Sequence, residues 1–507
     1  MPMSKRTHRV FIAFTVLLVW GAGGVAGCQA ELDGLLGTEK PGLDPPRDRF
    51  FFPTGLALTP DGRYLFVSNG NSDLKYNGGT VVVVDMIEAM GRLENPGDYP
   101  DSCRYAPQNS QLVECSEEDV GSTPGVVMSD LTVRTGFYPS FIAVEQVAES
   151  ACGTYLPAVE DGVVRYRLYT PVRGDPSLTY IDVITSDSSE VQCLDCGDGC
   201  TTNEIRDCKG GYRLEAPSEA RQDYVESILP DEPFCQALEP AGGFLVMAHL
   251  AGGSLSLVDL CGDPVDDGWR RPDLVDVLVG AMGQDTDGRS GGFNVVQRDP
   301  TDPWGWFYVS NRAAAQIMTL RVSGDPDQPV AEDRGLRLVV GPSLVLTAPF
   351  GPLESGADLR GLAMSSDSNR LFALSRTPPS LLVLDTSLQD GQPRNEVLDV
   401  VEICPKPSVL RVRTQDDGRT LAYAVCFASG EIYVVDTHDA QVVDRIEAGG
   451  GPHDLALMPD DAPQELRNFG LVSNFGEHTV GLIDLRPDSE TYHQMIGRLG
   501  WPEELMQ

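Results

Sequence analysis

The chain has 507 residues, with 75 Asp and Glu against 38 Lys and Arg, which gives a formal net charge of −37 at pH 7. Nucleic acids and anionic membrane surfaces bind basic protein faces, so this charge argues against both as partners. We interpret the excess acid as a solvated exterior that keeps an exported protein soluble.

The first 27 residues have the pattern of a secretory signal. A basic start with three Lys or Arg residues precedes an apolar core from Val10 to Trp20, which is too short for a good membrane span. The small residues that follow end in Val-Ala-Gly-Cys, which resembles the bacterial lipobox. The resemblance implies a lipoprotein whose mature chain begins at acylated Cys28, held stably at the membrane by two or more acyl chains. The alternative is an ordinary signal peptide with Cys28 free.

Residues 28–49 read as a flexible tether, because prolines, glycines and charged residues interrupt weak apolar positions. In the lipobox pattern, Gln29 after the cysteine implies the outer membrane. We therefore expect a lipid-anchored protein of the bacterial cell envelope, facing the periplasm or the surface.

Residues 50–85 predict three consecutive strands. Gly55–Thr59 alternates between apolar and polar residues, Tyr64–Ser68 is aromatic and β-branched, and Thr80–Asp85 is an apolar run. The first two runs are joined by Pro60–Gly62, where proline presets φ and glycine accepts positive φ, so a tight hairpin is expected.

This pattern occurs seven times. The last copy begins at Pro452, and the five between start near residues 139, 237, 293, 360 and 407. Candidate fourth strands follow several copies, at Asp273–Val279, Glu396–Ile403, Gln441–Glu447 and Gln494–Leu499. Four antiparallel strands repeated seven times predict an all-β, seven-bladed β-propeller.

The predicted propeller occupies residues 50–500, and residues 501–507 form a C-terminal tail. Insertions at about 90–130 and 186–232 lengthen the first two copies. In the second copy, strands are expected at 141–144, 155–160 and 163–169, the last of these being the third strand of its blade. The last copy has four strands of its own, so we expect seven self-contained blades.

The first copy, from Pro53 to Asn69 followed by Thr80–Asp85, resembles the YVTN repeat of YncE-like and lactonase-like propellers and of surface-layer proteins. The resemblance covers nearly all of Phe50–Leu499 and implies the propeller fold. It says little of activity, because one fold carries unrelated functions. The third and fifth copies lack the Val-Ser-Asn ending, and the sixth has Val425–Phe427 there.

Twelve cysteines in an exported chain predict disulfides. With Cys28 assigned to lipid, eleven remain, and this odd number leaves one thiol free or paired elsewhere. We expect Cys404 to pair with Cys426, because antiparallel strands bring these positions together. We also expect Cys103 to pair with Cys115 inside one insertion.

The later insertion holds a cluster of cysteines, namely Cys193, Cys196, Cys200, Cys208 and, at its far end, Cys235. Four thiolates could hold a metal or serve in redox sensing, but export favours disulfides, so no metal site is predicted. Cys152 and Cys261 lie in loops on one predicted face and are a further candidate pair. The sequence lacks a Cys-x-x-Cys-His motif, and no cofactor is predicted.

In a propeller the first strand of each blade lines the central channel, and the loops between second and third strands share one mouth with the connections between blades. The residues aligned with Asn69 are Glu160, His249, Asn311, Arg376, Phe427 and Asn474. Those aligned with Thr54 are Ser140, Phe234, Asn294, Arg360, Ser408 and His453.

From these rings we take five candidate ligand-binding residues, His249, His453, Arg360, Arg376 and Glu160, with Asp358 and Asp454 as further acids. Arginine would clamp a small anionic or carbonyl ligand, and histidine would act as acid or base. The alternative is turn chemistry, in which polar side chains cap loops beside a water-filled mouth. No catalytic residue is assigned.

We favour a non-enzymatic role, as an envelope scaffold that binds a protein or envelope component through its loops and channel mouth. The alternative is a hydrolase or oxidoreductase of the lactonase-like or quinoprotein-like propeller type, with its site at that mouth. No nucleic acid partner is expected.

Overall fold

The computed structural model describes residues 42–147, 163–186, 188–197, 199–200, 205–208, 210–218, 228–241, 243–261, 271–282, 291–325, 334–348, 351–352 and 358–502. The chain divides into a short unit that ends at Leu43 and a large unit from Asp44 to Gln507. The large unit is described below. None of the helices in the described ranges is long and apolar enough to span a membrane.

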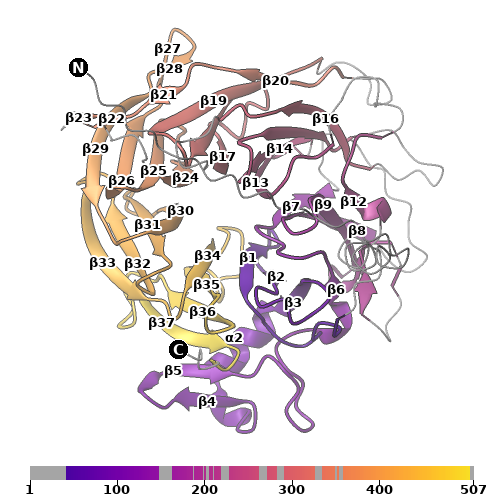
Figure 1. The fold of residues 1–507 in the computed structure, drawn as a ribbon. Coiled ribbons are helices and arrows are strands. Elements are labelled where there is room, and N and C mark those ends of the chain that lie inside the picture. Colours follow the sequence, from indigo (N-terminus) through magenta and orange to yellow (C-terminus); the bar gives the residue numbers. More distant parts are fainter. Residues whose placement is uncertain are drawn as a thin grey trace, which may run out of the picture. The chain divides into compact units, whose positions relative to one another are not determined.

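The large unit is a seven-bladed β-propeller, as the repeat predicts (Figure 1). From the innermost strand outward, the first blade consists of β1 Pro53–Leu58, β2 Tyr64–Asn69, β3 Thr80–Asp85 and β6 Val133–Arg134. The second consists of β7 Ala143–Gln146, β8 Val163–Val172, β9 Ser177–Thr185 and β10 Val191–Asp195. The third consists of β13 Pro233–Leu238, β14 Phe244–His249, β15 Leu255–Asp259 and β16 Asp273–Leu278. Neighbouring strands within each of these blades are antiparallel.

The other four blades have the same order. They are β17 Gly292–Gln297, β18 Trp306–Asn311, β19 Gln316–Ser323 and β20 Arg337–Val340; β24 Leu359–Met364, β25 Arg370–Arg376, β26 Pro379–Asp385 and β29 Glu396–Glu402; β30 Pro407–Thr414, β31 Thr420–Cys426, β32 Glu431–Asp436 and β33 Gln441–Glu447; β34 Pro452–Leu457, β35 Phe469–Asn474, β36 Thr479–Asp484 and β37 Gln494–Leu499. The innermost strands of successive blades contact one another, and β34 contacts β1, which completes the ring.

Short elements decorate the blades. The paired strands are β21 Leu344–Val345 beside β19, β22 Thr347–Ala348 with β23 Gly351–Pro352, and β27 Leu388–Gln389 with β28 Gln392–Pro393. The single-turn helices are η1 Pro96–Asp98, η2 Ser129–Leu131 and η4 Gly210–Tyr212. The core lies between blades, where the faces of adjacent sheets pack apolar residues such as Phe66, Leu168 and Val183 against each other.

Aspartates hold the turns between strands. Five third strands end in an Asp whose carboxylate accepts the backbone N–H two residues later, at Asp85, Asp259, Asp385, Asp436 and Asp484. The turn at Pro60 uses the same device, because Asp61 accepts the N–H of Arg63 at 3.1 Å. Such Asx-type bonds favour turns, so the repeat itself requires many acidic residues.

In the second blade the order of the strands differs from the one expected from the sequence. Residues 163–169, expected as a third strand, lie in β8, which pairs with the innermost strand β7 and is therefore the second strand. The third strand is β9, and the fourth, β10, lies within the segment that the sequence reading placed in an insertion. The expected strand at 155–160 lies outside the described residues.

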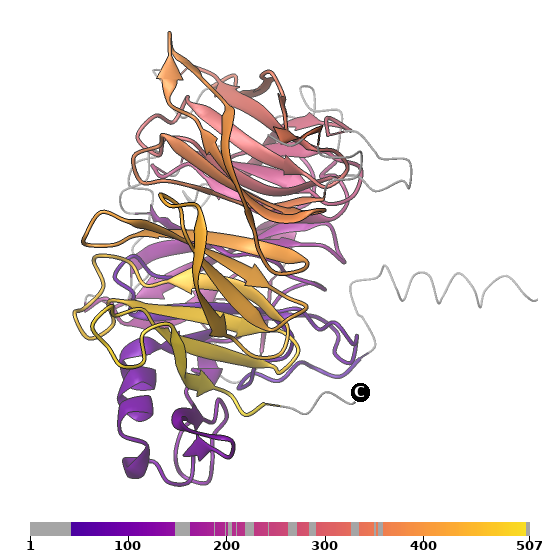
Figure 2. The ribbon, with the colours of Figure 1, turned by 90° about the vertical axis from the view of Figure 1, so that its left-hand side faces the viewer.

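The first insertion begins with helix α2 Met86–Glu94, which Asp85 caps by accepting the N–H groups of Ile87 and Glu88. It continues into a hairpin of β4 Cys103–Ala106 and β5 Asn109–Cys115. Strand β5 pairs in parallel with β37, so the first blade's insertion extends the last blade to six strands. Figures 1 and 2 show this hairpin beside the yellow strands of the last blade.

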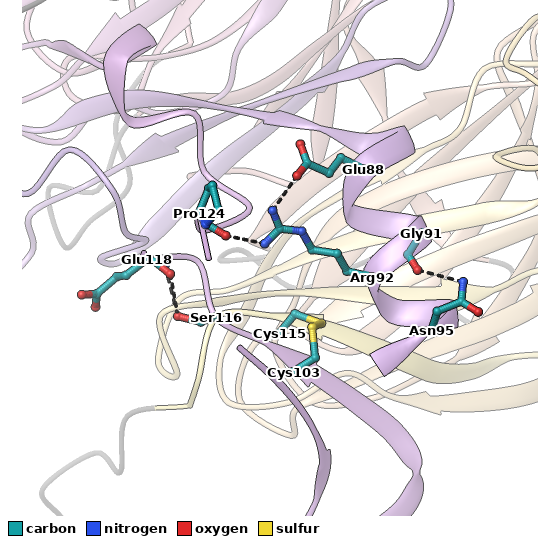
Figure 3. Close-up of a disulfide and its surroundings, with 9 residues drawn as sticks. All are labelled: Glu88, Gly91, Arg92, Asn95, Cys103, Cys115, Ser116, Glu118 and Pro124. Carbon is teal, nitrogen blue, oxygen red and sulfur yellow. Dashed lines mark hydrogen bonds and ion pairs between the residues drawn. A yellow bond between two sulfur atoms is a disulfide. The ribbon is translucent and has the colours of Figure 1, made fainter. Parts of the chain in front are cut away.

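We call this hairpin and its contacts the clasp. A disulfide joins Cys103 to Cys115 across the hairpin, and nearby the buried Arg92 donates to the carbonyl of Pro124 and to Glu88, each at 2.5 Å (Figure 3). The second insertion behaves similarly, because β11 Arg206–Asp207 pairs in parallel with β6 of the preceding blade, while β12 Arg213–Leu214 pairs with β9. Each insertion thus joins its blade to the one before it.

Candidate functional site

The mouth of the channel is the face at which innermost strands begin and second strands end. In six blades the pairing of these two strands shifts register at the first or second residue of the innermost strand. Such bulges re-aim side chains. The shifted positions are Thr54, Phe234, Phe293 with Asn294, Arg360 with Gly361, Ser408 and His453.

His249 ends β14 and is fully buried. One ring nitrogen, Nδ1, lies 3.2 Å from the carbonyl oxygen of Asp231, and Nε2 lies 2.8 Å from the hydroxyl of Ser256. Burial lowers the pKa of His249 to about 4. The side chain therefore connects the segment before β13 to strand β15 of its own blade and is neutral at pH 7.

His453 is half-buried at the bulge of β34. Its Nδ1 lies 2.7 Å from the carbonyl oxygen of Thr54, which can only accept, so Nδ1 carries the proton. Its ring stacks on Phe475 with centroids 5.7 Å apart and contacts Phe141 at 6.0 Å. Burial lowers its pKa below the ordinary value.

The backbone hydrogen bonds revise one of the sequence-derived rings. The N–H of Gly70 donates to the carbonyl of Phe52, and Arg376 makes the equivalent bond to Asp358, as does Arg312 to Gly291. Arg376 therefore corresponds to Gly70 and not to Asn69. The ring aligned with Gly70 contains Arg173, Leu250, Arg312, Arg376, Phe427 and Phe475.

Of the candidates drawn from the sequence, Arg360, Arg376 and Asp358 lie together, and Arg312, which was not among those candidates, joins them. Arg360 binds Asp358 through both carboxylate oxygens, with Nη2 to Oδ2 and Nε to Oδ1 each at 2.6 Å. Arg312 and Arg376 lie 3.9 Å from the same carboxylate. Three guanidinium groups thus share one carboxylate, which leaves two positive charges in excess. We call these four residues the arginine cluster.

The arginine cluster spans the fourth and fifth blades. Arg312 follows β18, Arg360 lies on β24 and Arg376 ends β25, where its Nε donates to the carbonyl of Pro407 at 2.9 Å. Arg360 is nearly buried, while Arg312 and Arg376 each keep 24% of their side-chain surface exposed. The two outer arginines are therefore accessible from solvent.

Repulsion between the arginines helps to lower the pKa values of Arg360 and Arg376. Burial, aided by the charges of Arg376 and Arg312, lowers the pKa of Arg360 to about 10 despite the bound carboxylate. Burial and the charge of Arg312 also lower the pKa of Arg376. With a pKa of about 10, Arg360 remains charged at pH 7. No hydrogen-bond acceptor for the Arg312 side chain is found in the described part of the chain, and its Nε is buried.

Aromatic rings flank the arginine cluster. On one side the Arg360 guanidinium lies 4.6 Å from the centre of the Phe293 ring, and Phe293 contacts Phe234. On the other side Phe427 follows Cys426, whose Cα partner is Pro407, the residue that accepts from Arg376. Phe427 is 39% exposed and contacts Phe475 at 6.0 Å.

The remaining candidates lie elsewhere. Glu160 and the lipidation residue Cys28 are outside the described residues, and the register of β8 places Val172 where Glu160 was expected. Asp454 is buried, with Oδ2 accepting from the N–H of Leu56 and Oδ1 from Arg411. Its contacts join three innermost strands, so it has a structural role.

The cysteines resolve into specific pairs. Cys404 bonds to Cys426 and Cys103 to Cys115, the two pairs that the sequence proposed. The cluster forms two disulfides, Cys193–Cys200 and Cys196–Cys208. Cys261 is also disulfide-bonded, and its expected partner Cys152 lies outside the described residues.

Cys235, grouped by the sequence with that cluster, is instead a buried free thiol on the innermost strand β13. Burial raises its pKa to about 11. Asn294 donates to its sulfur at 3.4 Å. Within the ranges that the structure describes, no group of three or more His, Cys, Asp or Glu side chains is placed to hold a metal.

A hollow of 1570 Å³ lies between the clasp and the outer strands of the last two blades. Its charged groups pair with one another, because Glu114 lies 2.7 Å from Arg498 and 3.2 Å from Arg104, and Arg498 also meets Glu477. This balance contrasts with the excess charge at the mouth. The arginine cluster is therefore the stronger candidate.

No family model matches the sequence, and no curated protein is significantly similar to it. Among solved structures, the chain is similar to the periplasmic gluconolactonase PpgL of Pseudomonas aeruginosa, at 14% identity over 80% of this chain and 87% of that chain, with a TM-score of 0.46. A protein from Lactobacillus plantarum has 14% identity over 87% and 98%, with a TM-score of 0.49. Hydrazine synthase from Kuenenia stuttgartiensis has 12% identity over 87% and 97%, with a TM-score of 0.42. Similarity at this level concerns the fold alone.

Proposed function

We propose that this protein is an exported, lipid-anchored propeller of the cell envelope that binds an anionic ligand at the mouth of its channel. The observation that carries the proposal is the arginine cluster, with three cations around the single carboxylate of Asp358. A guanidinium presents a planar fork of donors that matches carboxylate or phosphate oxygens. A bound anion would neutralise the excess charge and supply acceptors to Arg312, for whose side chain none is found among the described residues.

The division of roles follows from the contacts. Arg360 is already paired with Asp358, through a hydrogen bond from Nη2 and a close ion contact from Nε, so it positions the carboxylate and holds the cluster together. Arg312 and Arg376 lie farther from that carboxylate and are exposed, so they are the groups that would contact the ligand. We do not propose the enzymatic alternative, because both ring nitrogens of His249 are engaged and its ring is buried.

Calorimetry of the purified mature protein with acetate and phosphate at low ionic strength tests the binding proposal. We expect Arg376→Gln and Arg312→Gln each to weaken anion binding by about tenfold or more, since charge-assisted hydrogen bonds are lost. Arg419→Gln is the matched control, because Arg419 is exposed and pairs with Asp417 at the opposite end of the strands. Equal binding by all three variants would refute the proposal.

The lipid anchor is tested separately. Cells grown with labelled palmitate should incorporate the label into this protein, and the Cys28→Ala variant should lose the label and leave the membrane fraction. A membrane-bound Cys28→Ala variant would refute this part of the proposal without bearing on the anion site.

A further inference from the structure

We propose, on the basis of the function proposed above, that the ligand of the arginine cluster is a carboxylate carried on an aromatic or flat apolar body. The anion would meet Arg312 and Arg376, and the body would lie on the exposed ring of Phe427 in the next blade. This narrows the ligand from any small anion to an aryl carboxylate or a similar amphipathic acid.

The first argument is the position of Phe427. It is among the exposed large apolar residues, and the fold does not need it there, since its equivalents in other blades include Gly70 and Arg173. Its ring contacts His453 and Phe475. A partly exposed aromatic ring offers apolar contact that water does not satisfy.

The second argument is the continuity of aromatic contacts around the mouth. Phe427 contacts His453, His453 contacts Phe141, Phe141 contacts Phe234, and Phe234 contacts Phe293, with centroids 4.9 to 6.4 Å apart. Phe293 then meets Arg360. Phe293 belongs to the fourth blade and Phe427 to the sixth, on either side of the fifth blade, which carries Arg360 and Arg376. Phe293 is buried and Phe427 is 39% exposed, so Phe427 is the ring whose surface is open to a ligand held by its carboxylate.

The third argument concerns the backbone beside Phe427. Residues 449–451 are three consecutive glycines, and a Cβ on Gly451 would lie 3.3 Å from the Phe427 ring. Gly451 also has φ +64, which non-glycine residues adopt rarely. The loop therefore leaves one face of the ring closely packed by backbone and directs its exposed part to solvent.

The experiment compares three probes by calorimetry on the mature protein, namely 3-phenylpropionate, acetate and 3-phenylpropan-1-ol. We expect 3-phenylpropionate to bind tightest, and Phe427→Ala to weaken it by about three- to tenfold while leaving acetate binding unchanged. Tyr105→Ala, which removes an exposed aromatic side chain on β4, is the matched control and should change neither.

The outcomes separate the two proposals. Equal affinity for acetate and 3-phenylpropionate, or no effect of Phe427→Ala, would overturn the amphipathic ligand and leave the anion site standing. Binding of the alcohol as tightly as the acid, or failure of all anions to bind, would overturn both. Loss of acetate binding in Phe427→Ala would show that the variant disturbs the arginine cluster itself, and would also count against the inference.

Discussion

The clasp predicts a local effect of the substitution Glu114→Gln. Glu114 is buried, and its carboxylate lies 2.7 Å from Arg498 and 3.2 Å from Arg104. Strand β5, which carries Glu114, is also the strand that pairs with β37. Removing the charge leaves Arg498, whose side chain is only 11% exposed, with Glu477 at 3.4 Å as its remaining partner.

Breaking a buried ion pair costs about 3–5 kcal/mol when the other charge is left unpaired. Because Arg498 retains Glu477, we expect about 2 kcal/mol here. Arg104 is 48% exposed, so Arg104→Gln should cost less than about 1 kcal/mol and serves as the control. The Cys103–Cys115 disulfide is present in both variants, so the hairpin itself remains closed.

Amide hydrogen exchange read by mass spectrometry measures this opening. In Glu114→Gln, peptides covering 109–115 and 494–499 should exchange about 30-fold faster, the equivalent of about 2 kcal/mol, while those from 306–323 should not change. The double variant Glu114→Leu/Arg498→Met, which replaces the pair with apolar side chains, should recover most of the protection. The same acceleration in Arg104→Gln, or none in Glu114→Gln, would refute the role of the buried pair.

Three further outcomes are expected. Asp358→Asn should destabilise the protein by about 3 kcal/mol in urea denaturation at low salt, because three guanidinium groups lose their shared carboxylate, and added sulfate should restore much of the loss. The control Asp417→Asn, at an exposed pair, should change stability by less than about 1 kcal/mol. Burial raises the pKa of Glu117 from 4.5 to about 7, so the stability that the protonated carboxyl contributes is fully present below about pH 4.5 and is lost as pH rises through 7. The melting temperature of Glu117→Gln should therefore exceed that of wild type by an amount that grows between pH 4.5 and 7, and a constant difference would contradict the shift. Asp85→Ala should cost about 1 kcal/mol through loss of the α2 cap, and unchanged exchange in peptides from 86–94 would argue against it.

The fold could be predicted from the sequence because each copy of the repeat contains the local signals of strands and turns. Alternation, aromatic and β-branched runs and the turn at Pro60 each specify strands and hairpins, and seven copies in register specify the blades. The sequence contains no repeat signal of this kind for the clasp. Glu114 and Arg498 are 384 residues apart, and parallel pairing of β5 with β37 depends on ring closure, which local sequence does not encode.

In the ring that the sequence aligned with Asn69, Arg376 and Phe427 were misaligned by one residue, because Ser375 and Cys426 hold that position. Matching Ser375-Arg376 to Ser68-Asn69 placed Arg376 in the wrong ring. The buried pair Leu371-Phe372 aligns with Leu65-Phe66 and gives the register that the structure has. Buried apolar anchors keep their place against the neighbouring strand, whereas polar residues at a strand end shift freely, so the anchors were the better guide.

The acidic exterior and the cationic mouth have different physical origins. Many turns of the repeat carry a carboxylate, and those of Asp61 and Asp85 are partly exposed, so water screens their repulsion. The arginine cluster reverses the sign in a partly buried place, where repulsion is stronger because water screens it less. An anionic ligand would therefore be repelled by the protein as a whole and attracted within a few ångströms of Arg312 and Arg376. Such an arrangement selects against anions that offer charge alone, and it favours a ligand whose apolar body adds contact energy at Phe427.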